Sequence, residues 1–394
     1  MTSDQTMMET QAGGPGEFAR FDLSRVPSPC FVIDEAVIEN NLKILADISD
    51  KSGAKILSAL KAFSLPAVGP LISRYLSGTC SSGLFEAKLA RQYYSGELAT
   101  YCAGYKKEDM AEIIELSDHL IFNSPAQLER FLPIVKDSGK SIHIGLRINP
   151  EHSEGLVEKY DPCAPFSRLG TPLSQLTDEI MRHVDGLHFH TLCEQEFAPL
   201  LRTWEAVKPK IERYFPDLQW LNFGGGHHIT RFDYDRAGLI KLIKNIRAET
   251  SLEVYLEPGE AVALDAGILV GEILDLPENE MKLAITDISA TCHMPDVIEA
   301  PYRPQMLNEM NEGAPHRLGG PSCLAGDVIG DYCFAQEPQI GDRIAFLDQA
   351  HYSFVKTNTF NGVPLPAIAI WNSKSDTLRM VREFSYDDFL MRIS

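Results

Sequence analysis

The chain has 394 residues, of which 44% are hydrophobic, and a formal net charge of −19. This length allows two folding units. Because no run of Lys and Arg offsets the acids, nucleic acid and anionic membranes are unfavourable partners, whereas a small cationic substrate would be attracted. An acidic surface that serves only solubility is an equal alternative.

Eight cysteines are spread along the chain without a Cys-x-x-Cys pair or a framework of short spacings. This argues against a disulfide scaffold and a structural zinc site, and we expect no metal. Residues 1–20 contain acids and the run Gly13-Gly14-Pro15-Gly16, but neither a signal-peptide core nor a membrane-spanning stretch. We therefore expect a flexible leader at 1–20 and a cytoplasmic, reducing location.

From residue 30 to 262, short β-rich runs alternate with stretches of helical periodicity, as in βα units around a parallel sheet. One helix is expected from Pro125 to Val135, since Pro suits a helix start. Eight such units over this length favour a (β/α)8 barrel over an open doubly wound sheet. The expected strands are Lys55–Leu60, Gly78–Ser81, Leu98–Cys102, His119–Phe122, Ser141–Ile148, Asp185–Phe189, Trp220–Asn222 and Glu253–Leu256.

After residue 262 the pattern changes to short apolar runs, such as Arg343–Leu347 and Ile368–Trp371, between Gly- and Pro-rich turns. These runs predict a mainly antiparallel β domain. The predicted fold is thus an α/β protein with a TIM-like barrel at 30–262 and a C-terminal β domain at 263–394, which residues 21–34 are expected to join.

Polar groups follow the expected barrel strands at their carboxyl ends, where barrels of this kind carry their reactive residues. Lys61 follows the first strand, Arg147 nearly ends the fifth, and His190 follows the sixth. The triplet Gly224-Gly225-Gly226 follows the seventh, and Glu257 follows the eighth. A random scatter of residues would seldom produce this arrangement.

Lys61 is interpreted as a Schiff-base lysine, because an amine beside a buried strand is costly to keep charged and a lowered pKa makes it nucleophilic. A lysine that simply reaches water from a strand end is the alternative. Backbone N–H groups of Gly224-Gly225-Gly226 can approach an anion closely, which predicts a phosphate site, although a tight turn would use the same residues.

Glu257 could pair with the pyridine nitrogen of pyridoxal phosphate and keep it protonated; a surface carboxylate in the turn before Pro258-Gly259 is the alternative. His190 is suited to stack on the cofactor ring. His188, two residues earlier on the same strand, is interpreted as a core histidine.

The strand-end lysine, the histidine, the glycine triplet and the Glu-Pro-Gly turn together resemble the active-site pattern of the fold type III decarboxylases. These enzymes use pyridoxal 5′-phosphate and include the ornithine and diaminopimelate decarboxylases. The resemblance covers nearly the whole chain. Within this family, the chain most resembles the carboxynorspermidine/carboxyspermidine decarboxylase branch, whose members convert their substrates to norspermidine and spermidine in polyamine biosynthesis. The segments that carry it are Ala59–Phe63, Phe122–Ser124, Arg147–Glu151, Ser167–Gly170, Glu257–Ala261, Cys292–Asp296 and Gly320–Asp327.

The resemblance implies a set of roles. Lys61, His190, Glu257 and Cys323 would be catalytic, with Cys323 as the acid that reaches the active site from the second subunit of a homodimer. A buried structural cysteine is the alternative for Cys323. The residues that would bind the cofactor are Lys61, Glu86, Arg147, His190, Gly224, Gly225, Gly226, Glu257 and Tyr352. Cys80 stands where the ornithine enzyme has an aspartate.

Glu260 separates this chain from the ornithine and diaminopimelate enzymes, which usually carry arginine at that place. An anion there suits a substrate tail with cationic amines. Glu260 and Asp296 are the expected substrate carboxylates, Asp327 is the next candidate, and Asp287 and Glu299 follow. For each acid, a helix cap or a solvated residue is the alternative.

Other functions remain open. A related decarboxylase could act on diaminopimelate, ornithine or arginine. A racemase of this architecture would place arginine, and not Glu257, against the pyridine nitrogen. A non-catalytic cofactor carrier or polyamine-binding homologue is a further alternative, but carriers of this fold are lone barrels without the long C-terminal domain.

Overall fold

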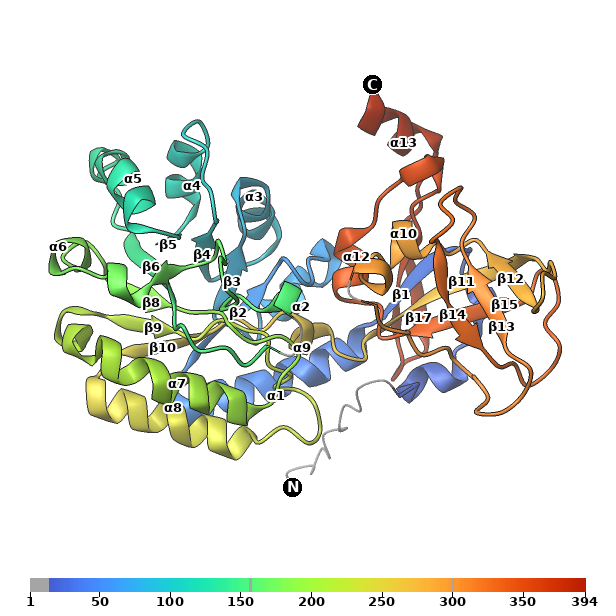
Figure 1. Ribbon diagram of the computed structural model, residues 1–394, viewed down its shortest axis with the longest axis horizontal. Coiled ribbons are helices and arrows are strands. Elements are labelled where there is room, and N and C mark those ends of the chain that lie inside the picture. Colours follow the sequence, from blue (N-terminus) through green and yellow to red (C-terminus); the bar gives the residue numbers. More distant parts are fainter. Residues whose placement is uncertain (1–13, 156–157, 300) are drawn as a thin grey trace. The chain divides into compact units, whose positions relative to one another are not determined.

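The computed structural model describes residues 14–155, 158–299 and 301–394. The chain divides into two compact units (Figure 1). Asn41–Val262 form the barrel unit, and the residues up to Asn40 together with Ala263–Ser394 form the sheet unit. The two division points fall within helices α1 (Glu35–Ser52) and α9 (Glu260–Ala263).

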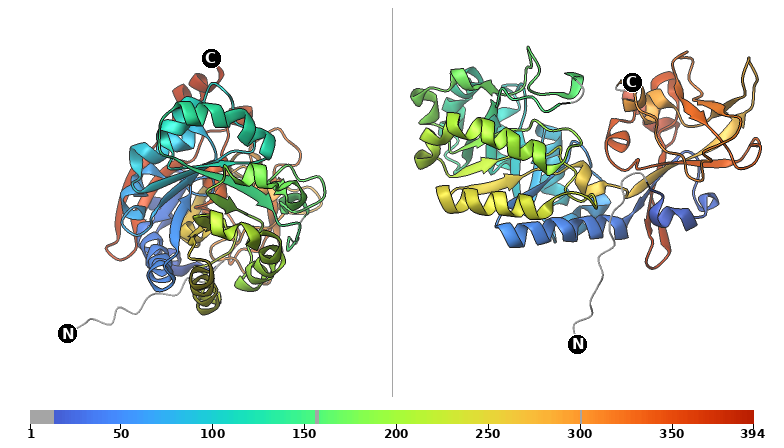
Figure 2. Two further views of the ribbon diagram at one scale, coloured as in Figure 1. Left: turned by 90° about the vertical axis from the view of Figure 1, so that its left-hand side faces the viewer. Right: turned by 60° about the horizontal axis from the view of Figure 1, so that its bottom comes forward.

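Eight parallel strands close into a barrel in the order β5-β4-β3-β2-β10-β9-β8-β6, and β6 pairs back to β5. The helices of the unit surround these strands (Figure 2, left). The predicted (β/α)8 barrel is therefore confirmed. The strands are β2 Lys55–Ala59, β3 Gly78–Ser81, β4 Glu97–Tyr101, β5 His119–Phe122, β6 His143–Asn149, β8 Gly186–His188, β9 Trp220–Asn222 and β10 Glu253–Leu256, with the short β7 Thr171–Pro172 beside β6.

The predicted strands match these bounds to within two residues at either end, and four of them match at both ends. The predicted helix at 125–135 is α5 Pro125–Asp137, where the Ser124 hydroxyl accepts a hydrogen bond from the Gln127 N–H at the helix start. The other helices of the unit are α2 Gly69–Ile72, α3 Leu84–Tyr93, α4 Met110–Leu116, α6 Asp178–Met181, α7 Phe197–Ile211 and α8 Arg236–Thr250.

Trp220 is the largest side chain of a core cluster to which five barrel strands contribute. Two glycines on neighbouring strands make room for its indole: a Cβ at Gly145 would lie 2.6 Å from the ring, and one at Gly186 only 2.0 Å away. Since protein interiors are close-packed, this local fit holds the barrel strands in register.

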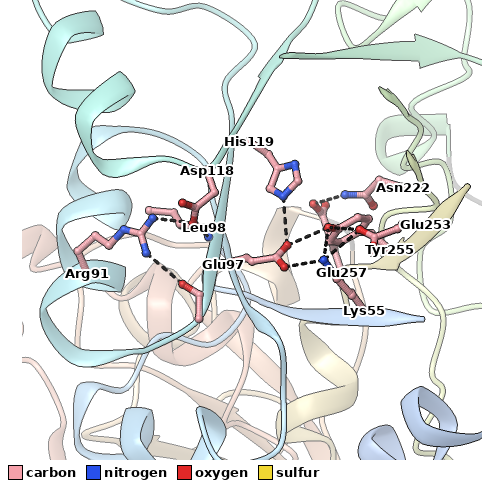
Figure 3. A network of polar contacts seen from close by, with 11 residues as sticks. Lys55, Arg91, Glu97, Leu98, Asp118, His119, Asn222, Glu253, Tyr255 and Glu257 are labelled. Atoms are coloured by element: carbon pink, nitrogen blue, oxygen red, sulfur yellow. Dashed lines mark hydrogen bonds and ion pairs between the residues drawn. The ribbon is translucent and has the colours of Figure 1, made fainter. Parts of the chain in front are cut away.

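A polar network occupies the amino-terminal end of the barrel strands (Figure 3). Lys55 Nζ lies 2.7 Å from a Glu97 carboxylate oxygen and 3.0 Å from one of Glu253. The second Glu97 oxygen accepts from the Tyr255 hydroxyl at 2.8 Å and lies 3.1 Å from His119 Nε2. Ion pairs and hydrogen bonds thereby join four strands that begin at this end, β2, β4, β5 and β10.

The sheet unit contains strands in the order β14-β13-β12-β11-β1-β16-β17, with β15 also on β11. It is mainly antiparallel, as predicted; only β1 with β16 and β12 with β13 run parallel. Its strands are β1 Cys30–Asp34, β11 Gly267–Asp275, β12 Leu283–Thr286, β13 His316–Gly319, β14 Val328–Tyr332, β15 Arg343–Leu347, β16 Ala367–Asn372 and β17 Thr377–Arg382, and its helices are α10 Ala290–His293, α11 Asp296–Glu299, α12 Tyr352–Lys356 and α13 Tyr386–Ile393.

The N-terminal boundaries differ from the expected ones. Strand β1 pairs with β11 and β16, so residues 30–40 belong to the sheet unit and the barrel unit begins at Asn41. Of the expected leader, residues 1–13 lie outside the described residues. Gly16–Arg20 form a 3-10 helix whose buried Phe18 packs 5.4 Å from the Trp371 ring, so this part is not a flexible leader. Across the described ranges, no helix has the length and apolar character needed to span a bilayer.

We predict that Glu97→Gln lowers the free energy of unfolding, and that the loss is largest at neutral pH. Burial acts to raise the pKa of Glu97, but hydrogen bonds from His119, Lys55 and Tyr255 outweigh it and lower that pKa to about 2. A folded pKa below the unfolded value of about 4.3 stabilises the fold above that pH and loses this effect as the pH falls toward 2. The variant should lose roughly 2 kcal/mol at pH 7, after allowance for partial exposure, and less at pH 3.5.

Urea denaturation at the two pH values measures this difference. Glu249→Gln is the matched control, since Glu249 pairs with Lys208 on the surface and its loss should change little. If the difference in unfolding free energy between the wild-type protein and Glu97→Gln stays constant or increases at pH 3.5, the stabilising role of the ionised Glu97 is contradicted.

Candidate active site

Polar residues gather at both ends of the barrel, and their charges distinguish the two ends. A cavity of about 590 Å³ at the amino-terminal end is lined by Lys55, Glu97 and Glu253, among others. These charges are paired: hydrogen bonds to Glu97, Tyr255 and Glu253 outweigh desolvation and raise the pKa of Lys55. Groups held so firmly in their charged states are poor acids and bases at neutral pH. The candidate active site therefore lies at the carboxyl end.

Lys61 follows β2 at this end. Its side chain is exposed to solvent, yet the surrounding strand ends desolvate its amine enough to lower its pKa, and the nearby Arg147 cation lowers it further. Its Nζ lies 3.4 Å from His190 Nε2. The amine thus has the property expected of an imine-forming lysine, a larger neutral fraction at physiological pH.

His190 is held in one orientation by the glycine loop. Its Nδ1 accepts a hydrogen bond from the Gly225 N–H at 3.1 Å, which places the ring proton of the neutral form on Nε2, facing Lys61. Desolvation, followed by the charges of Lys61 and Arg147, lowers the pKa of His190 well below its ordinary value. His190 is therefore a neutral imidazole at neutral pH.

Glu257 is only 5% exposed at the end of β10. One of its oxygens accepts from Asn222 Nδ2 at 2.7 Å (Figure 3), and the other lies 3.3 Å from His188 Nε2. Burial acts to raise the pKa of Glu257, but His188, Asn222 and Lys61 outweigh burial and lower it. Glu257 is consequently an ionised carboxylate at neutral pH.

Arg147 and Glu86 complete the predicted barrel residues. Arg147 is buried, donates to the His190 carbonyl at 2.9 Å, and places its guanidinium 4.6 Å from the Tyr101 ring centre. Glu86 lies in the first turn of α3 and accepts from the Ser82 N–H at 2.6 Å; desolvation raises the pKa of Glu86. Arg147 therefore belongs to the group around Lys61, whereas Glu86 holds the backbone of the turn that precedes α3.

The glycine loop differs in detail from the prediction. The Gly224 N–H donates to Asn222 Oδ1 at 2.8 Å and the Gly225 N–H to His190, so neither faces an anion. Gly226 has φ +83, and its N–H has no partner among the residues that the structure describes. Of the predicted phosphate site, only this N–H remains available within the triplet.

Glu260 begins α9, three residues after Glu257, and is 8% exposed. One of its oxygens lies 3.6 Å from His228 Nε2. Glu260 is also close enough to Lys61 for its charge to act on the pKa of that amine. It is therefore part of the same polar group as Lys61 and Glu257.

The remaining predicted residues lie in the sheet unit. Cys323 is exposed and lies on a turn, where its own N–H donates to Asn361 Oδ1 at 2.8 Å. Tyr352 is the first residue of α12. Asp296 pairs with Lys356 at 2.6 Å, and Glu299 lies 3.5 Å from the same amine. A cationic ligand at Asp296 would have to share its carboxylate with Lys356.

Asp327 and Asp287 have structural contacts. Asp327 is 4% exposed and accepts hydrogen bonds from the hydroxyls of Ser289 and Ser322 at 2.8 and 2.6 Å. Asp287 accepts from the Ser28 hydroxyl at 2.5 Å. Asp327 therefore organises the turn that carries Cys323, and its contacts give no support to the expectation that it binds substrate.

Asn222 is a site residue that sequence reasoning missed. It is the last residue of β9, so the rule that barrel chemistry lies at the carboxyl ends of strands could have selected it. What the sequence could not reveal is that its side chain contacts both Glu257 and the loop.

Two kinds of ligand could use this donor set. Atoms of His188, His190 and Glu257 lie within 4.8 Å of one another, as in some metal sites. However, both Glu257 oxygens and the His190 Nδ1 already have protein partners. A nucleophilic amine, an ionised carboxylate, a flat imidazole and the Gly226 N–H fit pyridoxal phosphate, which offers an aldehyde, a protonated ring nitrogen, a ring face and an anion.

Comparisons with known proteins agree with this chemistry. Residues 30–350 match the family model described as pyridoxal-dependent decarboxylase, C-terminal sheet domain. The chain is 40% identical to carboxynorspermidine/carboxyspermidine decarboxylase of Campylobacter jejuni, over 93% of this chain and 99% of the relative. It is 38% identical to carboxyaminopropylagmatine decarboxylase of Synechocystis, over 94% of this chain and 96% of the relative.

Among solved structures, carboxynorspermidine decarboxylase of Campylobacter jejuni complexed with norspermidine superposes with a TM-score of 0.86 at 38% identity. The superposition covers 93% of this chain and 100% of that chain. A diaminopimelate decarboxylase of Helicobacter pylori, at 17% identity and a TM-score of 0.79, shares the fold.

We predict that Arg147→Met slows modification of Lys61. Removing the guanidinium raises the pKa of Lys61, so fewer amines are neutral at pH 7.5 and reductive methylation by formaldehyde should slow roughly threefold to tenfold. Mass spectrometry of the Lys61 peptide in the cofactor-free protein measures the rate, with the peptide of the surface residue Lys208 as reference. Arg147→Lys keeps the cation and should restore the rate; equal or faster methylation in Arg147→Met would contradict the effect.

Proposed function

Because the chain belongs to the pyridoxal-dependent decarboxylases, we propose that it decarboxylates carboxynorspermidine or carboxyspermidine and releases norspermidine or spermidine in polyamine biosynthesis. The observation that carries the substrate class is the buried carboxylate of Glu260 beside Lys61 and Glu257. The 40% identity to the Campylobacter jejuni enzyme over nearly the full chain supports the same substrate.

The barrel residues provide the groups that the cofactor requires. Pyridoxal phosphate, when bound, supplies an electron sink for the bond pair that the departing carboxylate leaves on Cα. Lys61 would hold the cofactor through its aldehyde carbon, and the ionised Glu257 would accept a charge-assisted hydrogen bond from its ring nitrogen. His190 would lie against the ring face, and the Gly226 N–H would face the phosphate.

Substrate recognition would depend on charge. The amines of these substrates are cationic at neutral pH, and a buried carboxylate such as Glu260 binds an ammonium group strongly. The net charge of −19 would attract the substrate at long range. Asp296 is a second candidate only if the substrate displaces or shares the Lys356 contact.

Carboxyaminopropylagmatine is a second candidate substrate, because a relative that acts on it is 38% identical over 94% of this chain. Its agmatine part ends in a guanidinium group, whereas the carboxynorspermidine tail ends in a primary amine. A single carboxylate can accept two parallel hydrogen bonds from a guanidinium, so Glu260 by itself suits either tail.

Cys323 is our candidate for the acid that protonates Cα, and its exposed position would allow it to serve a neighbouring subunit of a homodimer. Tyr352 would contribute to the phosphate site. All eight cysteines are unpaired, which suits a reducing location such as the cytoplasm.

The substrate is tested by incubating the purified protein, with pyridoxal phosphate added, with carboxynorspermidine, carboxyspermidine, carboxyaminopropylagmatine and diaminopimelate, and measuring CO₂ release. We expect the highest kcat/KM with one of the first two and almost none with diaminopimelate. Lys61→Ala should abolish release. Preference for diaminopimelate would refute the proposal, and preference for the guanidinium substrate would favour the second candidate.

We predict that Glu260→Gln raises KM for the preferred polyamine substrate about tenfold or more, since a charge-assisted hydrogen bond is lost. The absorbance of the bound cofactor should change little. Glu112→Gln, which removes a surface partner of Lys88, is the matched control. An unchanged KM would show that Glu260 does not contact the tail.

A further inference from the structure

We propose that Asn222 is a positioning residue that holds Glu257 and the glycine loop in a single arrangement. This inference rests on the proposed function of Glu257 as the partner of the cofactor's ring nitrogen. Asn222 lies at the end of β9 and would act through Glu257, without touching the reacting atoms itself.

The two partners of the Asn222 amide fix its orientation. Its Oδ1 accepts from the Gly224 N–H at 2.8 Å, and its Nδ2 donates to Glu257 Oε1 at 2.7 Å. A backbone N–H can only donate, so it must face the amide oxygen, and the amide NH₂ must then face Glu257. With 2% exposure, the side chain is shielded from bulk solvent, so these protein contacts satisfy its hydrogen-bonding groups.

A closed set of contacts joins β9, the glycine loop and β10. The Glu257 N–H donates to the Gly224 carbonyl at 2.7 Å. Glu257 and Gly224 are therefore joined both directly, through the backbone, and through the Asn222 side chain. A Cβ at Gly225 would lie 2.1 Å from the Glu257 carbonyl oxygen, which shows how closely the two segments approach.

The loop extends this arrangement to His190. Once Gly224 is held by Asn222, the next N–H, that of Gly225, points at His190 Nδ1. One amide side chain thereby influences two groups proposed to flank the cofactor, the carboxylate and the imidazole.

Asn222 differs from the other groups around Glu257 because it carries no charge at any pH. Glu257 faces His188 from β8, Lys61 after β2, Cys80 from β3 and His190 after β8. Each of these groups can change its protonation state, and burial lowers the pKa of His188. Asn222 is the donor that cannot titrate, so its hydrogen bond to the carboxylate persists across the pH range.

The experiment compares Asn222→Asp with the wild-type holoenzyme. Aspartate has the same size and still accepts from the Gly224 N–H, but it replaces the donor to Glu257 with a second carboxylate. We expect the dissociation constant of pyridoxal phosphate, from absorbance titration, to rise about tenfold or more. The acidic limb of the kcat profile should shift to higher pH by about one unit, with KM changed less than about threefold.

Asn222→Ala is the second variant, with a shift of the same sign but smaller size. In a Glu257→Gln background, Asn222→Asp should have little further effect, because it still accepts from the Gly224 N–H and the carboxylate through which it acts has already been removed. Gln127→Ala is the matched control: it removes another buried amide that donates to backbone carbonyls and should reduce stability without moving the acidic limb.

Reduced thermal stability with an unchanged cofactor dissociation constant and an unchanged acidic limb would overturn the role of Asn222. Additive losses of Asn222→Asp in the Glu257→Gln background would overturn it as well. If the wild-type protein releases no CO₂ from any substrate, the proposed function fails, and the cofactor dissociation constants of the Asn222 variants and their pH dependence still decide this inference.

Discussion

A carboxylate, Glu257, carries its charge at a position where only 5% of its surface is exposed, and the carboxyl end of the barrel is arranged around that constraint. An isolated buried carboxylate would take up a proton. Here Asn222 donates to one oxygen and His188 lies beside the other, so the charge persists without a full counter-ion in contact. The same contacts determine where the glycine loop runs, and the loop in turn orients His190.

The two ends of the barrel use ionisable residues for opposite purposes. At the amino-terminal end, Lys55 and Glu97 move each other's pKa away from neutrality, and the result is stability. At the carboxyl end, the cation of Arg147 stands near Lys61 and makes its amine easier to deprotonate. Stabilising pairs and functional groups are thus separated by the length of the strands, an arrangement common to this fold.

Local patterns in the sequence predicted much of this. The alternation of runs identified all eight barrel strands, and the residues after them included Lys61 and Glu257. The place of β1 could not be read locally, because it pairs Cys30 with Val270 and Ala367, far away in the chain. Likewise, nothing near Asp327 in sequence indicates that its carboxylate accepts a hydrogen bond from the Ser289 hydroxyl. The partners of the glycine N–H groups also depend on tertiary contacts.

The pKa directions at the site also bear on how its chemistry divides. Lys61 and Glu257 both have lowered pKa values, yet the consequences are opposite: the amine gains neutral character as a nucleophile, and the carboxylate remains an acceptor. Their mutual attraction favours the charged lysine, so a neutral amine requires that desolvation and Arg147 outweigh the pull of Glu257. Hydrogen bonding of Glu257 by the neutral Asn222 serves this balance, because it stabilises the carboxylate without adding another charge that would act on Lys61.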